Sequence, residues 1–273
     1  MAHLRTLGLA HGDSVMVHAS VRAVGQVAGG PDQIHLAIKD AIGVEGTLLM
    51  YASCPAYYDE FGRGTLAPEV EAELRDKLPP FDGLTARSAR DNGALVELLR
   101  TYPGSRVNDH VVRFVAWGAR ADHLLTPQPW DFAYGAGSAL ERFLELDGKI
   151  LMLGSDHDTV TFLHYTEHVG DFPGKCVIRY QVPVLEGGDR GWRWMSEVDT
   201  SDGGAHAHWP DRLFAKIVDG HLRATGNRGG RVGDAATWLM SARALHEEAL
   251  PIMTRLVMDA RSASGLAEGS DPV

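Results

Sequence analysis

Short apolar runs and longer amphipathic segments alternate along the chain, and this pattern predicts an α/β protein. Runs rich in Val, Leu, Ile and Met predict buried strands at residues 14–18, 47–52, 111–117 and 150–153. Amphipathic segments predict helices at 3–10, 31–43, 67–78, 93–101, 139–146, 211–224 and 241–260. Two further runs flank Gly187 and Gly188, so residues 176–198 are predicted to form a hairpin.

Polar, glycine-rich segments separate these elements and predict loops at residues 53–66, 103–110, 199–210 and 225–233. The loop at 53–66 is long and follows a predicted buried strand. Because binding residues are often carried on such loops, we expect this one to lie near a functional site.

The stretch from residue 149 to 168 carries the strongest chemical signal. The strand at 150–153 stops at Gly154, and three N-cap candidates for a helix follow it: Ser155, Asp156 and Asp158. That helix carries His164 and Glu167 three residues apart, so both side chains project from one face. A neutral imidazole can accept a proton while a nearby carboxylate orients it. His164 and Glu167 are therefore the predicted catalytic pair.

Two other interpretations of this stretch stay open. A His and a Glu one turn apart also occur on solvated helix faces. His164 and His168 have the spacing of zinc-binding helices, with acidic residues at 156 and 158 just upstream, although the order is not His-Glu-x-x-His. The second interpretation corresponds to a metal-dependent hydrolase.

Composition indicates an ordinary folded protein. The chain has 273 residues, of which 44% are hydrophobic and 23% charged. We expect one domain over residues 1–262 and a flexible tail of small polar residues over 263–273. No apolar run is long enough to span a bilayer, and the N-terminus lacks a signal-peptide core. With only Cys54 and Cys176, read as structural thiols, we expect a cytoplasmic protein without disulfides.

The net charge of −10 narrows the classes of partner. It argues against binding to nucleic acid, which depends on neutralising phosphates. It is compatible with a polycationic ligand, although excess acid also serves solubility. A non-catalytic polycation-binding protein is thus a further alternative.

The loop over residues 18–31 offers a candidate anion site. It carries hydroxyl groups, glycines and Arg22 ahead of a predicted helix, so backbone N–H groups and a cation could face a phosphate. It matches neither the P-loop nor the dinucleotide-binding pattern, and an ordinary tight turn is the alternative. It also lacks the signature of the common N-acetyltransferase fold, because Val27 stands where Gly or Ala is needed.

Several motifs together are more specific than any one of them. From about residue 5 to 258 the chain carries, in order, His18–Gly25, Gly29–Pro31, Gly46–Met50, Gly135–Ser138, Leu151–Gly154, Asp158–Glu167 and Val232–Ala235. In this combination the chain resembles the aminoglycoside 3-N-acetyltransferase family. The resemblance implies a three-layer α/β/α fold specific to that family and distinct from the common N-acetyltransferase fold.

The resemblance also implies a reaction. Members of the family move an acetyl group from acetyl-CoA to the 3-amino group of the 2-deoxystreptamine ring of aminoglycosides, which confers resistance. We therefore expect acetyl-CoA as co-substrate, no metal, an aminoglycoside as partner, and a monomer or homodimer. His164 would act as general base in a direct attack, with Glu167 as its partner and no covalent acyl-enzyme.

The remaining site residues follow from the same resemblance. The predicted coenzyme site consists of His18, Ala19, Ser20, Val21, Arg22, Val24, Gly25, Gly29 and Arg106. The predicted acceptor site consists of Tyr51, Glu197, Asp199 and Asp202. Structural or surface roles for His18, Arg22 and Arg106 are the alternatives. The chain departs from the family at 106–110, where Arg-Val-Asn-Asp-His replaces Arg-Ser-x-His/Asn-Pro, and at 202–210, which is less acidic than in the family.

Overall fold

A mixed seven-stranded sheet forms the centre of the protein. The structure, a computed structural model, describes residues 1–173, 175–199 and 209–263, with side chains up to Asp259. The strand order is β3-β4-β2-β1-β5-β9-β8. The strands are β1 (Ser14–Ala19), β2 (Thr47–Tyr51), β3 (Arg106–Val107), β4 (Phe114–Gly118), β5 (Lys149–Leu153), β8 (Gly230–Val232) and β9 (Ala235–Ser241).

The three central strands run in the same direction. β1 pairs in parallel with β2 on one side and with β5 on the other, whereas β4 and β9 are antiparallel to their inner neighbours. The carboxyl ends of β1, β2 and β5 therefore meet at one edge of the sheet. Loops that leave this edge are in a position to build a common site.

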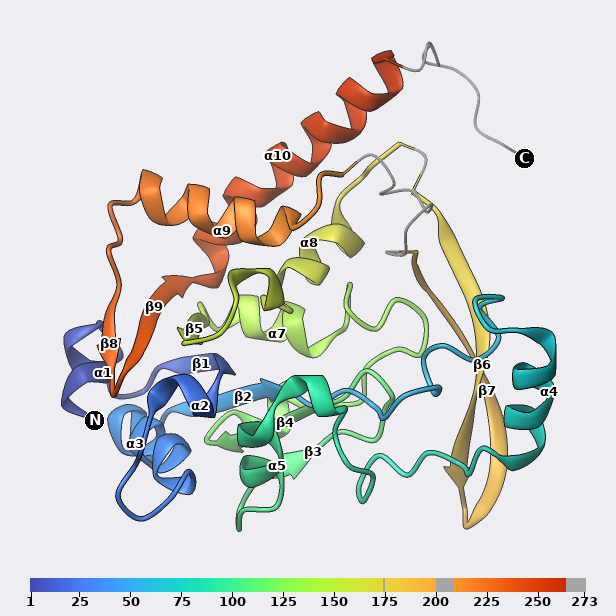
Figure 1. Cartoon of the computed structure of the whole chain (residues 1–273), viewed down its shortest axis with the longest axis horizontal. Helices are drawn as coiled ribbons and strands as arrows, with labels where there is room; N and C mark the ends of the chain where they lie inside the picture. The colour runs from blue at the N-terminus through green and yellow to red at the C-terminus, as the bar shows by residue number, and fades with distance from the viewer. Residues whose placement is uncertain (174, 200–208, 264–273) are drawn as a thin grey trace.

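Helices cover both faces of the sheet (Figure 1). Met16, Leu49 and Ile150 point to the face packed by α7 (Ala139–Glu145), α8 (Leu163–Val169), α9 (Leu213–Ala224) and α10 (Ala242–Ala263). Val15 and Leu151 point to the opposite face, which is packed by α1 (Ala2–Thr6), α3 (Asp32–Ile42) and α5 (Ala94–Arg100). This alternation buries both faces of the central strands, and the predicted three-layer α/β/α fold is confirmed.

A separate hairpin stands beside these layers. Its strands are β6 (Val177–Glu186) and β7 (Asp189–Val198), joined at Gly187 and Gly188 as predicted. The hairpin lies next to α4 (Pro68–Lys77) (Figure 1), and the Arg190 guanidinium donates to backbone carbonyls of that helix. Near its end, Ser196 O accepts from Phe132 N at 2.6 Å. The end of β7 is thereby brought towards α8.

The sequence prediction differs from the structure in local details. α8 begins at Leu163, because Asp156 caps a short 3₁₀ turn, η2 (His157–Thr159), and Val160 leaves the helical region with φ −68° and ψ 89°. The short strands β3 and β8 lie in segments predicted as loops, and β9 was not predicted. The two remaining short helices are α2 (Val21–Val24) and α6 (Ala121–Leu124), and a 3₁₀ turn, η1, spans Arg90–Asn92.

Most of the predicted C-terminal tail, from residue 264 on, lies outside the described residues. In the part that the structure describes, no helix is long and apolar enough to cross a membrane.

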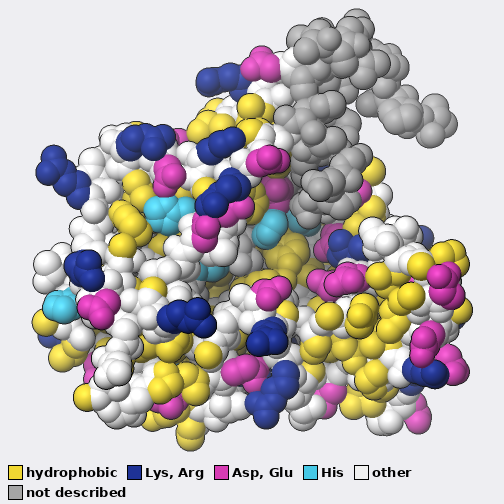
Figure 2. Space-filling view, viewed as in Figure 1, with side chains coloured by type: hydrophobic (Ala, Val, Ile, Leu, Met, Phe, Trp, Pro, Cys, Tyr) yellow, Lys and Arg dark blue, Asp and Glu magenta, His cyan; other side chains and the backbone are white. Residues whose placement is uncertain are grey.

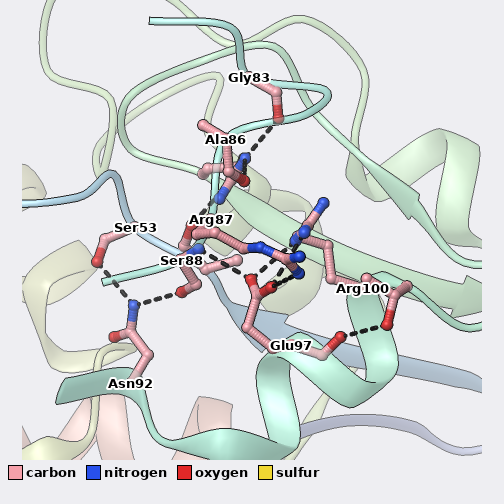
Figure 3. Close-up of polar contacts among 11 residues, drawn as sticks. Ser53, Gly83, Ala86, Arg87, Ser88, Asn92, Glu97 and Arg100 are labelled. Carbon is pink, nitrogen blue, oxygen red and sulfur yellow. Dashed lines mark hydrogen bonds and ion pairs between the residues drawn. The ribbon is translucent and has the colours of Figure 1, made fainter. Parts of the chain in front are cut away.

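A buried arginine fastens a loop to the edge where the central strands end. Arg113 is fully buried; its Nε donates to Ala52 O at 2.9 Å, and its Nη1 donates to Gly83 O at 2.6 Å and Ala86 O at 2.8 Å. The same loop is held at further points, which Figure 3 shows. Glu97 accepts from Ser88 N and from two guanidinium groups, and Asn92 donates to Ser53 and Ser88. The loop over residues 82–92 is thus fixed beside the end of β2.

We predict that Arg113→Leu destabilises the protein by about 3–5 kcal/mol, because three backbone carbonyls lose a buried charged donor. Urea unfolding followed by circular dichroism measures this difference. Arg120→Leu is the matched control, since Arg120 is exposed and its loss should change stability by less than about 0.5 kcal/mol. Equal unfolding midpoints for the two variants would contradict the role given to Arg113.

Candidate active site

His164 and Glu167 form a hydrogen-bonded pair on the first turns of α8. His164 Nδ1 lies 2.5 Å from Glu167 Oε2. The Glu167 side chain is buried, whereas the imidazole is about one-third exposed at 32%. The predicted contact is therefore present. Because the carboxylate engages Nδ1, the second ring nitrogen, Nε2, is left for a ligand.

The surroundings of His164 raise its pKa. Burial alone disfavours the imidazolium, but the charge of Glu167 and its hydrogen bond favour it, and Glu197 and Asp158 add to this effect. The net result is a pKa above the ordinary value of histidine. Glu167 thus makes His164 a stronger base than burial alone would allow.

A cavity of about 140 Å³ opens in front of His164, and we call it the histidine cavity. Several parts of the chain line it. These are the end of β2, the loop at 53–66, the segment at 129–137 that precedes α7, helix α8, and both strands of the hairpin. Its polar lining includes Tyr51, Asp59, Arg63, Tyr134, His168 and Glu197. The predicted functional loop at 53–66 does reach this cavity.

The hairpin contributes a buried ion pair to the histidine cavity. Glu197 is buried, accepts from Tyr180 OH at 2.8 Å, and forms an ion pair with the Arg63 guanidinium. Burial raises the pKa of Glu197 against the opposing influence of Arg63. Glu197, predicted from the sequence, thus shares the cavity with His164. Arg63 and Asp59 were missed; their only sequence signal is their place in the long loop.

A second cavity of about 110 Å³ lies at the carboxyl ends of β1 and β2. Its lining includes His18, Ala19, Tyr51, Asn92, Ser155 and Thr161. Tyr51 lines both cavities, and its hydroxyl is hydrogen-bonded to that of Tyr134. Burial raises the pKa of both tyrosines, so both hydroxyls stay protonated at neutral pH. The two cavities therefore meet at a neutral hydrogen-bonded pair.

Two residues of the predicted coenzyme loop, His18 and Ala19, line the second cavity, and most of the loop comes directly after them in the sequence. Ser20 Oγ accepts from Ala23 N at 3.3 Å and caps α2, which holds Val21, Arg22 and Val24. Gly25 has φ 85°, and an added Cβ there would clash with Asp234. Gly29 also has φ 85°. His18 is partly buried, with its Nε2 atom buried, and burial lowers its pKa to about 4, so it is neutral at pH 7.

Arg106 lies apart from this loop. It is exposed on the edge strand β3, and its Nε lies 2.9 Å from Asp122 Oδ1. The residues that replace the family pattern beside it hold local structure. Asn108 Oδ1 accepts from Phe114 N at 2.6 Å, and Asp109 Oδ1 accepts from Gly83 N at 3.1 Å. Within the described chain, Arg106 is therefore not brought together with His18 or His164.

The remaining predicted residues are placed as follows. Asp199 comes directly after β7, and its backbone N donates to Cys176 O at 2.9 Å. Asp202 lies outside the described residues. Cys54 is buried with a raised pKa, caused chiefly by burial, and Cys176 is exposed; both are free thiols. Among the described side chains, no group of three or more His, Cys, Asp and Glu could hold a metal ion.

Comparison with known proteins identifies the family. The model of the aminoglycoside 3-N-acetyltransferase family matches residues 16–254. The chain belongs to this family. The resemblance seen in the motifs is thereby confirmed, and so is the predicted class of enzyme, an acyltransferase.

Similar proteins cover nearly the whole chain. It is 37% identical to an aminoglycoside N(3)-acetyltransferase III of Pseudomonas aeruginosa, over 89% of each chain. It is 37% identical to an aminoglycoside N(3)-acetyltransferase VIII of Streptomyces fradiae, over 88% of this chain and 85% of that protein.

Solved structures agree. AAC-IIIb, in a binary complex with CoASH, has a TM-score of 0.85 and 40% identity, over 93% of this chain and 94% of its own. AAC-VIa, bound to sisomicin, has a TM-score of 0.82 and 34% identity, over 93% and 95%.

Because Glu167 supports the protonated form of His164, we predict that Glu167→Gln lowers the pKa of His164. The substitution removes the negative charge and keeps the size of the side chain. NMR titration of the imidazole Cε1–H signal measures the shift, with His123, an exposed histidine, as internal reference. An unchanged titration of His164 in the variant would show that the pair does not set its pKa.

Proposed function

We propose that this protein transfers an acetyl group from acetyl-CoA to the 3-amino group of the 2-deoxystreptamine ring of aminoglycosides and so confers resistance, with His164 as general base. The observation that carries the proposal is the His164–Glu167 pair facing the histidine cavity. Family membership supports the reaction. Metal-dependent hydrolysis has no comparable support, and a non-catalytic role would leave this pair without a purpose.

The reaction proceeds by direct attack. An ammonium has no lone pair, so the acceptor nitrogen first loses one proton to solvent and attacks as the neutral amine, and a second proton must leave the nitrogen on attack. His164 Nε2 accepts that proton as the C–N bond forms, and Glu167 stabilises the resulting imidazolium. The tetrahedral intermediate then expels coenzyme A as the C–S bond breaks, and the imidazolium can return its proton to the departing sulfur.

Coenzyme A is proposed to occupy the loop that starts at the end of β1. The contacts would come from His18, Ala19, Ser20, Val21, Arg22, Val24, Gly25 and Gly29, with Arg106 on β3 as a further proposed contact. The loop supplies backbone N–H groups and the Arg22 cation for phosphates. The CoASH complex of AAC-IIIb supports coenzyme binding by this fold. The second cavity, between this loop and the histidine cavity, suits the thioester end.

The aminoglycoside is proposed to enter the histidine cavity from the side of the hairpin. Tyr51, Glu197, Asp199 and Asp202 are the proposed contacts, and Asp59 adds a carboxylate to the same lining. Opposite charge between a polycation and a protein of net charge −10 steers and orients the encounter. The sisomicin complex of AAC-VIa supports this class of acceptor.

We also propose a single acetyltransferase domain over residues 1–262, a cytoplasmic location, and a monomer or homodimer as the working state.

His164→Ala should lower kcat for acetyl transfer by a factor on the order of 10²–10⁴, because a positioned general base is lost. Acetyl-CoA binding should stay nearly unchanged. Release of coenzyme A, followed with a thiol reagent over an aminoglycoside panel, measures the rate, and calorimetry measures coenzyme binding. His123→Ala, at an exposed position, is the control and should behave like the wild type. Activity of His164→Ala within a few-fold of the wild type would exclude His164 as the base.

The KM for the aminoglycoside should rise with salt, because screening weakens attraction between the polycation and the acidic protein. Asp199→Asn combined with Asp202→Asn should flatten this dependence, which steady-state kinetics from low to high ionic strength would measure. Asp40→Asn combined with Glu45→Gln, both at exposed positions, removes the same number of charges and is the control. Equal salt dependences in the double variant and the wild type would remove this segment from the acceptor site.

A further inference from the structure

The histidine cavity contains a second imidazole besides that of His164. His168 lies one turn further along α8 and lines the same cavity. Both imidazoles contact the Tyr134 ring, with centroid distances of 5.1 Å for His164 and 5.3 Å for His168. The sequence suggested only a zinc-binding role for His168, and the proposed acetyl transfer does not involve its side chain.

The backbone fixes the tautomer of His168. Its Nδ1 lies 2.8 Å from the carbonyl oxygen of His164. A carbonyl can only accept a hydrogen bond, so Nδ1 carries the proton and Nε2 of the neutral ring presents a lone pair. Nε2 is buried and has no hydrogen-bond partner among the described residues.

The charged groups around His168 do not compensate for its burial. Burial lowers its pKa to about 4, despite its hydrogen bond to the His164 carbonyl. His164 and Lys175 also lower its pKa, while Glu167 raises it. The Lys175 ammonium donates to His168 O at 2.9 Å, so a cation lies beside this turn of the helix. The His168 ring is thus neutral at pH values at which the His164 ring can be charged.

Several other polar groups of the cavity are already engaged. The hydroxyls of Tyr51 and Tyr134 bond to each other, and the Glu197 carboxylate is held by Arg63 and Tyr180. A buried acceptor without a partner is unfavourable, and a donor on a bound molecule would relieve it. His168 Nε2 is therefore a buried acceptor without a partner on a residue that lines the cavity.

We propose that His168 Nε2 accepts a hydrogen bond from an amino or hydroxyl group of the acceptor molecule and so holds the attacking amine in front of His164. His168 is then a residue for acceptor binding and specificity, and not a proton acceptor in the reaction. This inference rests on the proposed acetyl transfer.

The test compares His168→Ala, His168→Gln and a control in steady-state assays with sisomicin as acceptor. The control is His246→Ala: His246 lies on α10, and its Nδ1 is 2.8 Å from Thr166 Oγ1 of α8, outside the histidine cavity. His168→Ala should raise the KM for sisomicin about ten-fold, as expected for one lost hydrogen bond. The KM for acetyl-CoA and the acid limb of the pH profile, which His164 sets, should not change. Gln keeps an acceptor oxygen in the cavity and should restore part of the affinity.

The outcomes separate the inference from the proposed function. Wild-type protein that releases no coenzyme A with any aminoglycoside would refute the acetyl transfer itself. With active wild-type enzyme, an unchanged sisomicin KM in His168→Ala, or the same rise in His246→Ala, would overturn the role of His168. An acid limb that moves with His168→Ala would make it a proton acceptor, which also contradicts the proposal. Thermal melting checks that each variant is folded. If His168→Ala is unfolded, sisomicin binding to His168→Gln is measured in its place.

Discussion

The parallel pairing of β1 with β2 and β5 is the constraint on which the rest of the structure depends. It places three strand ends at one edge of the sheet, so that His18, Tyr51 and the turn leading to α8 come from distant parts of the sequence to one region. Strands buried on both faces also require helices above and below, which fixes the three layers. The hairpin stands outside this scheme, yet it closes the histidine cavity by contributing Glu197.

Charge in the histidine cavity is arranged in pairs. Glu167 is matched with His164, and Glu197 with Arg63, so neither buried carboxylate lacks a partner. The imidazoles of His164 and His168, both on α8, differ in basicity. One is bonded to a carboxylate and gains basicity, while the other is bonded to a carbonyl and stays neutral. The same residue type thus differs in basicity because its hydrogen-bond partner differs.

The Arg63–Glu197 pair also bears on how a polycation is recognised. The Glu197 carboxylate in the lining of the histidine cavity is already paired with a cation of the protein itself, Arg63, which comes from the long loop at 53–66. If the acceptor binds as proposed, an ammonium group that approaches Glu197 must share it with Arg63, so this contact would orient the acceptor more than it tightens binding. Asp59, on the same loop, has no such partner among the described contacts and would attract the acceptor directly.

By itself, the sequence determined the features that depend on local pattern. Short apolar runs located β1, β2 and β5, the Gly187–Gly188 turn set the hairpin, and the spacing of His164 and Glu167 put them on one helix face. Motifs in a fixed order identified the family. Tertiary structure alone decided which residues share a cavity: it added Arg63, Asp59 and His168, gave Glu197 a counter-ion, and left Arg106 on an edge strand. These outcomes depend on contacts between segments distant in sequence, and local propensity contains no information about them.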